Sequence, residues 1–368
     1  MNRLLIIGNG FDISHGLESR FKDFIEDYFR NAIHTFIEQN SYSDELFEIG
    51  FKHSGYGFDK RTKPPEKNGI LDKVSGYKSD SSYKVVFHSL LLSRIFDTAC
   101  SLNWVDIEII FFQVLNATKH GYENSDQKGA IEKVNSQLEF LKNKLITYLI
   151  GQESNNQSKN AEKSAILKCF TEKIKKKEIV TKRLVLDTTP DNLYFLNFNY
   201  TNVLENYIKA CSNEIPTEVN YIHGDLTRKH GDPIFGFGDE LDKKYLEFEN
   251  EKNYNSLVKH IKSFEYLKTK NFYNLTRFVE SSEFQVHIYG HSCGISDRTL
   301  LNQIFEHENC KSIKVFYYRQ ENGENDFVEK SYEIARHFRN KTIFRKKLVP
   351  MEMSTPMPQI IRDQKIKV

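Results

Sequence analysis

The feature that most constrains the fold is a run of four aliphatic residues near the start of the chain, residues 4–7, which leads directly into Gly8. An unbroken apolar run that ends in a glycine turn is typical of a strand covered on both faces, as in a parallel sheet, because such strands lose the alternation of polar and apolar residues. We therefore predict an α/β fold in which residues 4–7 form a buried strand of a parallel sheet.

The segment after this strand is rich in glycine, with Gly8, Gly10 and Gly16 placed around Asn9 and Asp12. Glycine lets backbone amides come close to a phosphate or a ribose where a Cβ would collide. Because ligands of open parallel sheets bind outside the carboxyl ends of the strands, this loop predicts a nucleotide site. The third glycine of the Gly-x-Gly-x-x-Gly fingerprint is missing, and a lone Gly-x-Gly also occurs in turns that bind nothing.

Further strands are expected in the second half of the chain, and each ends in a polar residue or a glycine. Four of them, with their end turns, fall within residues 192–202, 218–226, 233–240 and 284–297, and a last strand is predicted at 312–318. The carboxyl ends of parallel strands lie along one edge of the sheet. The residues expected to converge there with Gly8 and Gly10 are Asn199, His223, Gly238 and Ser292.

A long insertion separates the two parts of the predicted α/β domain. Apolar residues recur at helical spacing within 83–102, 107–118 and 130–151, which predicts a mainly helical insertion. The α/β nucleotide-binding domain is then discontinuous and comprises residues 1–38 and 180–348. The insertion covers 39–179, with a polar, irregular segment at 39–82, and residues 349–368 form a tail.

Two acids of the insertion, Asp106 and Glu108, follow the only tryptophan, Trp104. Asp106 is an ordinary N-cap candidate for the helix predicted at 107–118. A catalytic carboxylate pair is the alternative. Both interpretations, and the role of Trp104, stay open.

Composition and charge exclude several classes of protein. The chain has 52 basic and 50 acidic residues and a net charge of +2, which gives no general case for a nucleic-acid or membrane-surface partner. Its five cysteines form no Cys-x-x-Cys pair, so neither a disulfide framework nor a structural zinc site is expected. We find no secretion signal, and the apolar runs are shorter than the roughly 20 residues of a membrane helix. We expect a cytoplasmic protein without a membrane partner.

Two residues are candidates for chemistry at the predicted edge. His223 stands at a strand end before a glycine, where an imidazole can meet a ligand and titrate near neutrality. Asn199 lies in a polar turn and can orient a water or a ribose hydroxyl. The alternatives are a histidine that bonds a neighbouring loop and an asparagine that only forms its turn.

Two other kinds of active site were considered. The pattern Gly-x-Ser-x-Gly of the nucleophile elbow occurs at 290–294, after a strand and before a helix, but only His307 and His337 follow Ser292 in the chain order that the elbow requires. A metal site is not expected, because no His-x-x-x-His or His-Glu-x-x-His pair falls on a predicted helix.

Taken together, these motifs resemble the AbiH family of bacterial abortive-infection proteins, which act against bacteriophage. The resemblance spans most of the chain. In order, the motifs that carry it lie at residues 6–12 with 15–17, 104–108, 198–201, 222–224, and 289–292 with Asp297.

The same order is similar, at greater distance, to the sirtuin-type NAD-binding domain, which is Rossmann-like. Gly8, Gly10 and Gly16 match the spacing of its glycine loop, and Asn199, His223 and Ser292 match its asparagine, its histidine before glycine and its late serine. The resemblance implies cleavage of the nicotinamide–ribose bond of NAD, with Asn199 orienting the attacking water and His223 acting on a ribose hydroxyl or that water. It implies cofactor-binding roles for Gly8, Asn9, Gly10, Asp12, Gly16, Gly238, Gly290, Ser292 and Asp297.

The chain departs from the sirtuin pattern in three respects. It cannot form the four-cysteine zinc module of a sirtuin deacylase, so deacylation is not expected. Asp12 stands where the sirtuin loop has a small residue. Thr201 replaces the usual aspartate after the asparagine, and with these two changes a nucleotide other than NAD stays open.

We therefore expect an effector of anti-phage defence that binds a nucleotide and hydrolyses NAD. The first alternative is a nucleotide-binding sensor or toxin module that acts through a partner without turnover. A nuclease ranks third, because the chain lacks both a basic stripe and a metal-ligand cluster of acids. The expected partners are the nucleotide and a phage-derived trigger, without stable nucleic acid; homo-oligomerisation stays open.

Overall fold

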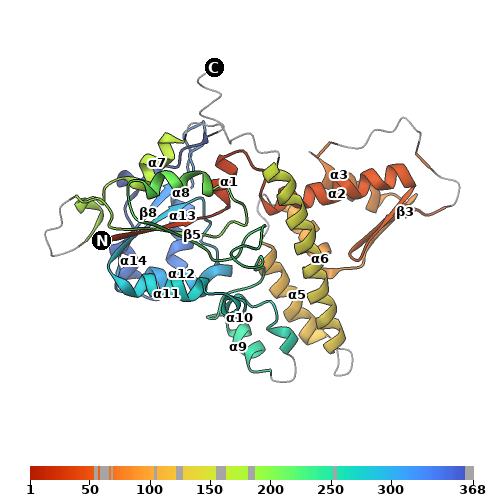
Figure 1. Cartoon of the computed structure of the whole chain (residues 1–368). Coiled ribbons are helices and arrows are strands. Elements are labelled where there is room, and N and C mark those ends of the chain that lie inside the picture. The colour runs from red at the N-terminus through yellow and green to blue at the C-terminus, as the bar shows by residue number, and fades with distance from the viewer. Residues whose placement is uncertain are drawn as a thin grey trace, which may run out of the picture. The chain divides into compact units, whose positions relative to one another are not determined.

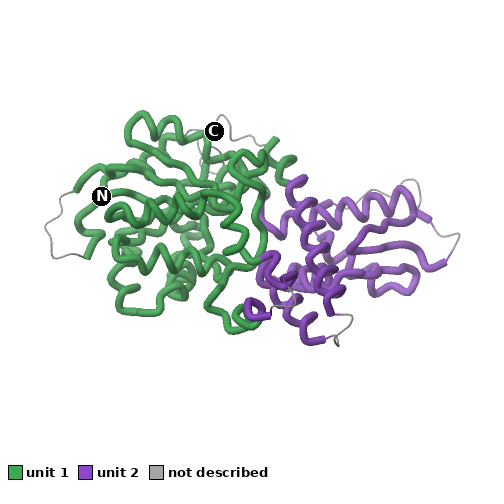
Figure 2. Tube along the Cα trace, turned by 60° about the horizontal axis from the view of Figure 1, so that its bottom comes forward, with its two compact units in different colours: residues 1–18, 149–247, 261–368 green, residues 19–148, 248–260 purple. Residues whose placement is uncertain are grey.

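The chain divides into two compact units, which are described separately (Figure 2). Unit 1 comprises Met1–Glu18, Leu149–Glu247 and Ile261–Val368, and unit 2 comprises Ser19–Tyr148 and Phe248–His260. The computed structural model describes residues 1–53, 57–58, 66–67, 69–102, 106–121, 127–154, 163–180, 187–251 and 255–360. None of the helices within these ranges is long and apolar enough to cross a membrane.

Unit 1 is built on a six-stranded sheet in the order β6-β5-β1-β7-β8-β9. Two of its strands, β5 and β8, are labelled in Figure 1. All neighbouring strands run parallel, so the predicted α/β fold with a parallel sheet is confirmed. The first strand of the chain lies inside the sheet, between β5 and β7. The strands are β1 (Asn2–Ile7), β5 (Leu193–Asn197), β6 (Thr217–Tyr221), β7 (Phe284–Tyr289), β8 (Cys310–Tyr317) and β9 (Thr355–Pro356).

The side chains of β1 alternate between two apolar cores, one on each face of the sheet. Leu4 and Ile6 belong to the core that also holds residues of α11 (Asn271–Ser281), α12 (Arg298–Glu306) and α13 (Phe327–Arg336). Leu5 and Ile7 belong to the opposite core, with α1 (Asn9–Ser14), α7 (Ser164–Thr171) and α8 (Glu205–Ser212). Each of these four β1 side chains is fully buried, which stabilises the fold by about 1.5–3 kcal/mol per side chain.

Unit 2 combines helices with a small antiparallel sheet in the order β2-β3-β4. The strands are β2 (Ser41–Ser43), β3 (Phe47–Phe51) and β4 (Tyr83–Phe87). Its helices are α2 (Phe21–Gln39), α3 (Ile70–Ser79), α4 (Leu90–Ser101), α5 (Ile107–Gly121) and the larger part of α6 (Gln127–Ser154).

The interval 39–82 is more ordered than its polar composition predicts, since its described residues include β2, β3 and α3. Isolated aromatic side chains explain the difference. Phe47 packs edge-on against Phe29 of α2, and Phe51 packs against Phe36 of the same helix, with ring centroids 5.3 and 5.2 Å apart. The helix predicted at 83–102 is likewise divided: β4 comes first, and Ser89 caps the shorter helix α4 by accepting a hydrogen bond from the Leu92 amide.

Three further boundaries differ from the sequence analysis. The strand predicted at 233–240 is a loop, and its β-pairing within the described residues is limited to one isolated bridge between Phe237 and Ile261. The tail contributes the edge strand β9. Unit 2 begins at Ser19 and therefore contains α2, whereas the sequence analysis assigned residues up to 38 to the α/β domain.

Candidate functional site at the carboxyl edge of the sheet

The loop after β1 packs directly on the loop after β7. The Gly10 amide donates a hydrogen bond to the Gly290 carbonyl at 2.8 Å. A Cβ on Gly10 would lie 2.8 Å from the Gly290 Cα, and one on Gly8 would lie 2.5 Å from the His291 Cα. Gly290 itself has a φ of 66°, in the left-handed region that favours glycine. The glycines of both loops are therefore required by their close approach.

Polar side chains stand two residues beyond the ends of three parallel strands, β5 and β6 on one side of β1 and β7 on the other. Asn199 follows β5, His223 follows β6 and His291 follows β7. All three are nearly buried, with 5–8% of their surface exposed. Because the carboxyl ends of the parallel strands of one sheet lie along the same edge, this equal offset brings the three side chains to one edge of unit 1.

Asn199 is held by the loop after β1. Its amide nitrogen Nδ2 donates to the Gly8 carbonyl at 3.0 Å and to Oδ1 of Asp12 at 2.8 Å. The other carboxylate oxygen of Asp12 accepts a hydrogen bond from the Thr201 hydroxyl at 2.5 Å. The two positions that depart from the sirtuin pattern, Asp12 and Thr201, thus contact each other.

His223 lies between an aromatic residue and a carboxylate. Its Nε2 is 3.0 Å from the Tyr266 hydroxyl and 3.5 Å from Oδ1 of Asp297. Its ring lies parallel to that of Tyr266 and edge-on to that of Phe198, at centroid distances of 6.0 and 5.1 Å. These contacts fix the imidazole in one orientation.

Asp297 joins His223 to the loop after β7. Lys262, which is 1% exposed, donates from Nζ to Oδ1 of Asp297 at 2.6 Å, and His291 Nε2 lies 3.6 Å from Oδ2. We call Asp12, Asn199, Thr201, His223, Lys262, His291 and Asp297 the carboxyl-edge cluster.

Burial controls the protonation of the cluster. It raises the pKa of the Asp12 carboxyl to about 7, because the hydrogen bonds from Thr201 and Asn199 offset only part of the desolvation. It lowers the pKa of His223 to about 3 and that of His291 to about 4. For Asp297, burial acts to raise the pKa, but Lys262 and the two histidines outweigh it and hold the pKa below its usual value. At neutral pH the two imidazoles are therefore neutral beside an ionised Asp297.

The structure brings most of the sequence-predicted residues together at this edge. Asn199, His223 and Asp297 belong to the cluster, with the glycines at 8, 10 and 290 beside them. Gly238 adjoins it, since a Cβ there would lie 2.7 Å from the Ser296 carbonyl and 3.2 Å from the Lys262 side chain. Gly16 follows two residues after the end of α1 and has a φ of 84°. Asn9 lies in the first turn of α1 and is half-buried.

The nucleophile-elbow alternative finds no support in the geometry. Ser292 is half-buried, and its hydroxyl oxygen accepts a hydrogen bond from the Gly294 amide at 3.4 Å. Among the described residues, no histidine forms a hydrogen bond with this hydroxyl. A serine nucleophile needs a base within hydrogen-bond reach.

The acids of the insertion, Asp106 and Glu108, belong to unit 2. Asp106 accepts a hydrogen bond from the Ile109 amide at 3.0 Å, which is the contact of an N-cap residue. Trp104 lies outside the described residues. No group of three or more histidine, cysteine or acidic side chains within the described ranges is placed to hold a metal ion.

Three members of the cluster were not predicted from the sequence as site residues: Lys262, His291 and Thr201. His291 and Thr201 stand inside the motifs that carried the family resemblance, so their positions were a usable signal. Lys262 begins α10 (Lys262–Glu265) in a long charged stretch with many other lysines. Only its burial beside Asp297 distinguishes it.

Comparison with known proteins identifies the family. Neither the curated proteins nor the solved structures include a match to this chain. The family model described as "Bacteriophage abortive infection AbiH" matches residues 4–319, which include all members of the carboxyl-edge cluster. This match covers most of the 368 residues, and the chain therefore belongs to the AbiH family and has a function in abortive infection by bacteriophage.

Proposed function

We propose that this protein binds a nucleotide at the carboxyl edge of the sheet, in a sirtuin-like arrangement, and hydrolyses NAD at the nicotinamide–ribose bond. Loss of NAD would arrest the infected cell. The observation that carries the proposal is the position of Asn199 and His223 at one edge, where Asn199 is bonded to the loop of closely packed glycines and His223 is held by Tyr266 and Asp297.

The proposed reaction is a hydrolysis. Water attacks C1 of the nicotinamide ribose, the C–N bond to nicotinamide breaks, and its electron pair returns to the pyridine ring. The water loses one proton, and the products are ADP-ribose and nicotinamide. No oxidant, reductant or metal is needed for the balance.

Asn199 is the proposed residue that orients the water. Both hydrogen bonds of its Nδ2 are made to the protein, so the amide oxygen is the atom that remains for a ligand. A carbonyl oxygen accepts a hydrogen bond from water and leaves a lone pair of the water directed elsewhere. Asn199 therefore supports positioning rather than proton transfer.

His223 is the proposed contact to a ribose hydroxyl. Because its pKa is lowered to about 3, the ring is neutral at physiological pH and can accept a hydrogen bond. Asp297 and Lys262 form an ion pair beside it, which keeps the carboxylate charged without protonating the histidine.

One observation favours the alternative of a nucleotide-binding sensor without turnover. Nε2 of His223 is already paired with Tyr266, and a base with so low a pKa removes protons weakly at neutral pH. A site that binds a nucleotide and signals through a partner would need only the orientation, and not the basicity, of this histidine.

The test is nicotinamide release from NAD by the purified full chain, measured with and without lysate of phage-infected cells. The wild type is compared with His223→Ala and Asn199→Ala, and with Gly151→Ala as a matched control on the exposed face of α6, where a Cβ meets no atom within 4 Å.

The hydrolase would be established if the wild type and the control release nicotinamide and both site variants release it roughly 100-fold or more slowly. If ADP-ribose binds but nicotinamide is released under neither condition, the sensor function replaces it. Turnover that persists in both site variants would place the chemistry elsewhere in the chain.

A further inference from the structure

We infer that Asp12 is the positioning residue of Asn199: it fixes which end of the Asn199 amide faces the ligand, and does not itself touch the ligand. The catalytic consequence of this inference rests on the proposed function. The orientation of the amide does not, and can be measured without turnover.

The hydrogen bonds of the Asn199 side chain allow only one orientation of the amide. Its two partners are the Gly8 carbonyl and the Asp12 carboxylate, and a carbonyl oxygen can only accept. If the amide were turned over, its oxygen would face both of these acceptors. The NH2 group must therefore point into the protein, which leaves the amide oxygen outward.

The backbone at Asn199 is fixed as well. The Asn199 amide N–H donates to Oδ1 of Asn197 at 3.1 Å, which ties the turn to the last residue of β5. Among the described residues, the outward oxygen of Asn199 forms no hydrogen bond, and it is not among the buried polar atoms that lack a partner. It is therefore a free acceptor with access to solvent, as a site for water or a hydroxyl requires.

Asp12 is held on its other side by Thr201. With Oδ1 bonded to Asn199 and Oδ2 to the Thr201 hydroxyl, both carboxylate oxygens are occupied inside the protein. The side chain is 2% exposed. Asp12 is therefore positioned to act through Asn199 and is closed to direct contact with a nucleotide.

The surroundings of Asp12 make this arrangement sensitive to pH. The charged group that acts on it is Glu153, near the end of α6, which repels it. No cation among the described residues offsets the burial, and the pKa of Asp12 rises to about 7. Ionisation then strengthens the hydrogen bond from the Asn199 NH2 group, since charge-assisted bonds are the stronger ones.

The experiment compares Asp12→Asn with Asp12→Ala. An asparagine at position 12 keeps both hydrogen bonds, because its oxygen accepts from Asn199 and its NH2 group donates to the Thr201 hydroxyl, but it does not titrate. An alanine removes both. Thr201→Ser, which keeps the hydroxyl, and Thr201→Val, which loses it, form a second matched pair should Asp12→Ala fail to fold.

The first readout is the side-chain amide signal of Asn199 in the full chain labelled with [15N]asparagine, assigned by its loss in Asn199→Ala. We expect this signal to shift with a midpoint near pH 7 in the wild type, to stay constant with pH in Asp12→Asn, and to move to the position of a free amide in Asp12→Ala. A signal that is the same in wild type and Asp12→Ala would overturn the inference, whether or not the protein hydrolyses NAD.

The second readout is nicotinamide release. We expect kcat to fall roughly 100-fold in Asp12→Ala with KM for NAD changed less than about 3-fold, because a misplaced orienting group costs rate rather than affinity. Asp12→Asn should keep the rate and lose the pH dependence near neutrality. An equal loss in Asp12→Asn and Asp12→Ala would show that the carboxylate acts directly and would contradict a positioning role.

Failure of this inference can be distinguished from failure of the proposed NAD hydrolysis. If the wild type releases no nicotinamide, NAD hydrolysis is wrong, and the amide signal still decides the orientation of Asn199.

Discussion

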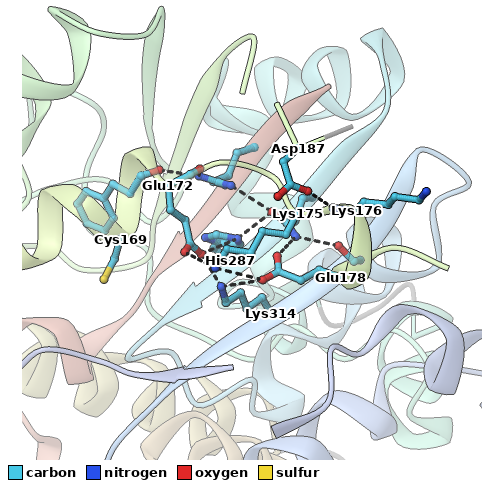
Figure 3. Close-up of polar contacts among 12 residues, drawn as sticks. Cys169, Glu172, Lys175, Lys176, Glu178, Asp187, His287 and Lys314 are labelled. Atoms are coloured by element: carbon cyan, nitrogen blue, oxygen red, sulfur yellow. Dashed lines mark hydrogen bonds and ion pairs between the residues drawn. The ribbon is translucent and has the colours of Figure 1, made fainter. Parts of the chain in front are cut away.

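Two of the clusters of buried polar residues in unit 1 are built differently. The first is the carboxyl-edge cluster. The second lies on the face of the sheet, over β1, β7 and β8 (Figure 3). We call it the sheet-face network, and its members are Arg3, Glu172, Glu178, Gln285, His287 and Lys314.

The sheet-face network pairs its charges. Lys314, whose side chain is fully buried, contacts Glu172 and lies 3.0 Å from Glu178. Arg3 donates to the Phe170 and Glu172 carbonyls and to Gln285. Glu172 and Glu178 belong to the segment after α7, so this pairing attaches that segment to the sheet.

The carboxyl-edge cluster leaves groups unmatched. Asp12 has no cation beside it among the described residues, and the outward oxygen of Asn199 accepts no hydrogen bond there. Asp297, which two neutral histidines face, is paired with Lys262. The sheet-face network in turn has one buried nitrogen without a hydrogen-bond partner, Nε of Arg3. The difference between the two clusters is therefore one of charge: Lys314 pairs with the carboxylates of the sheet-face network, whereas burial without a cation raises the pKa of Asp12 to about 7. The comparison teaches that a paired buried charge does not by itself indicate a site, whereas a buried carboxyl with a shifted pKa is a candidate for function.

The largest loss of stability is expected from a substitution that breaks the sheet-face network. Lys314→Met removes the closest cation of the buried Glu178 and leaves it Lys175 at 3.9 Å and the amide of Gln285, which should lower the free energy of unfolding by about 3–5 kcal/mol. Lys311→Met is the matched control on the same strand, because Lys311 pairs with Glu283 at the surface, and there the loss should stay below about 1 kcal/mol. Urea denaturation measures both. Equal losses of unfolding free energy in the two variants would mean that the sheet-face network stabilises the fold no more than a surface ion pair does.

The second prediction concerns the contact between the loops after β1 and β7. Gly10→Ala places a Cβ 2.8 Å from the Gly290 Cα, and the resulting overpacking should cost about 1–3 kcal/mol. Gly151→Ala, on the exposed face of α6, should instead stabilise the chain by about 0.5–1 kcal/mol, because alanine is the better helix former. Thermal unfolding would contradict the close approach of the loops if both variants gained stability.

The smallest expected effect is a pH dependence at His223. Because its pKa is about 3 in the folded protein and 6.5 in a model peptide, only the unfolded chain takes up this proton as the pH falls below 6.5. Between pH 7.5 and 5.5 the wild type should therefore lose about 1.4 kcal/mol of stability that His223→Gln does not lose. Denaturation curves at the two pH values measure the difference. Equal losses in both proteins would show that His223 is not buried as described.

The sequence predicted the parts of this site that depend on local pattern. The apolar run at 4–7 indicated β1, and a polar residue soon after a strand end indicated Asn199 and His223. The antiparallel strand β3 was not predictable, because the packing of Phe47 and Phe51 on α2 stabilises it in place of a long apolar run.

The partners of the predicted residues could not be foreseen. Lys262 and Tyr266 reach Asp297 and His223 from a stretch of helical turns between the strands, and nothing in their local sequence distinguishes them from neighbouring lysines and tyrosines. The pairing of Asp12 with Thr201 joins residues 189 positions apart. Such contacts depend on how the loops meet in three dimensions, and the residue pattern does not encode them visibly.

The most direct test of the account is phage protection in bacteria that express the full chain. The measured quantity is the efficiency of plating on cells with wild type, His223→Ala, Asn199→Ala or Gly151→Ala, at matched amounts of folded protein. We predict that the wild type and Gly151→Ala protect the culture and that the other two do not. Full protection by His223→Ala and Asn199→Ala would contradict the claim that the carboxyl-edge cluster carries the abortive-infection function.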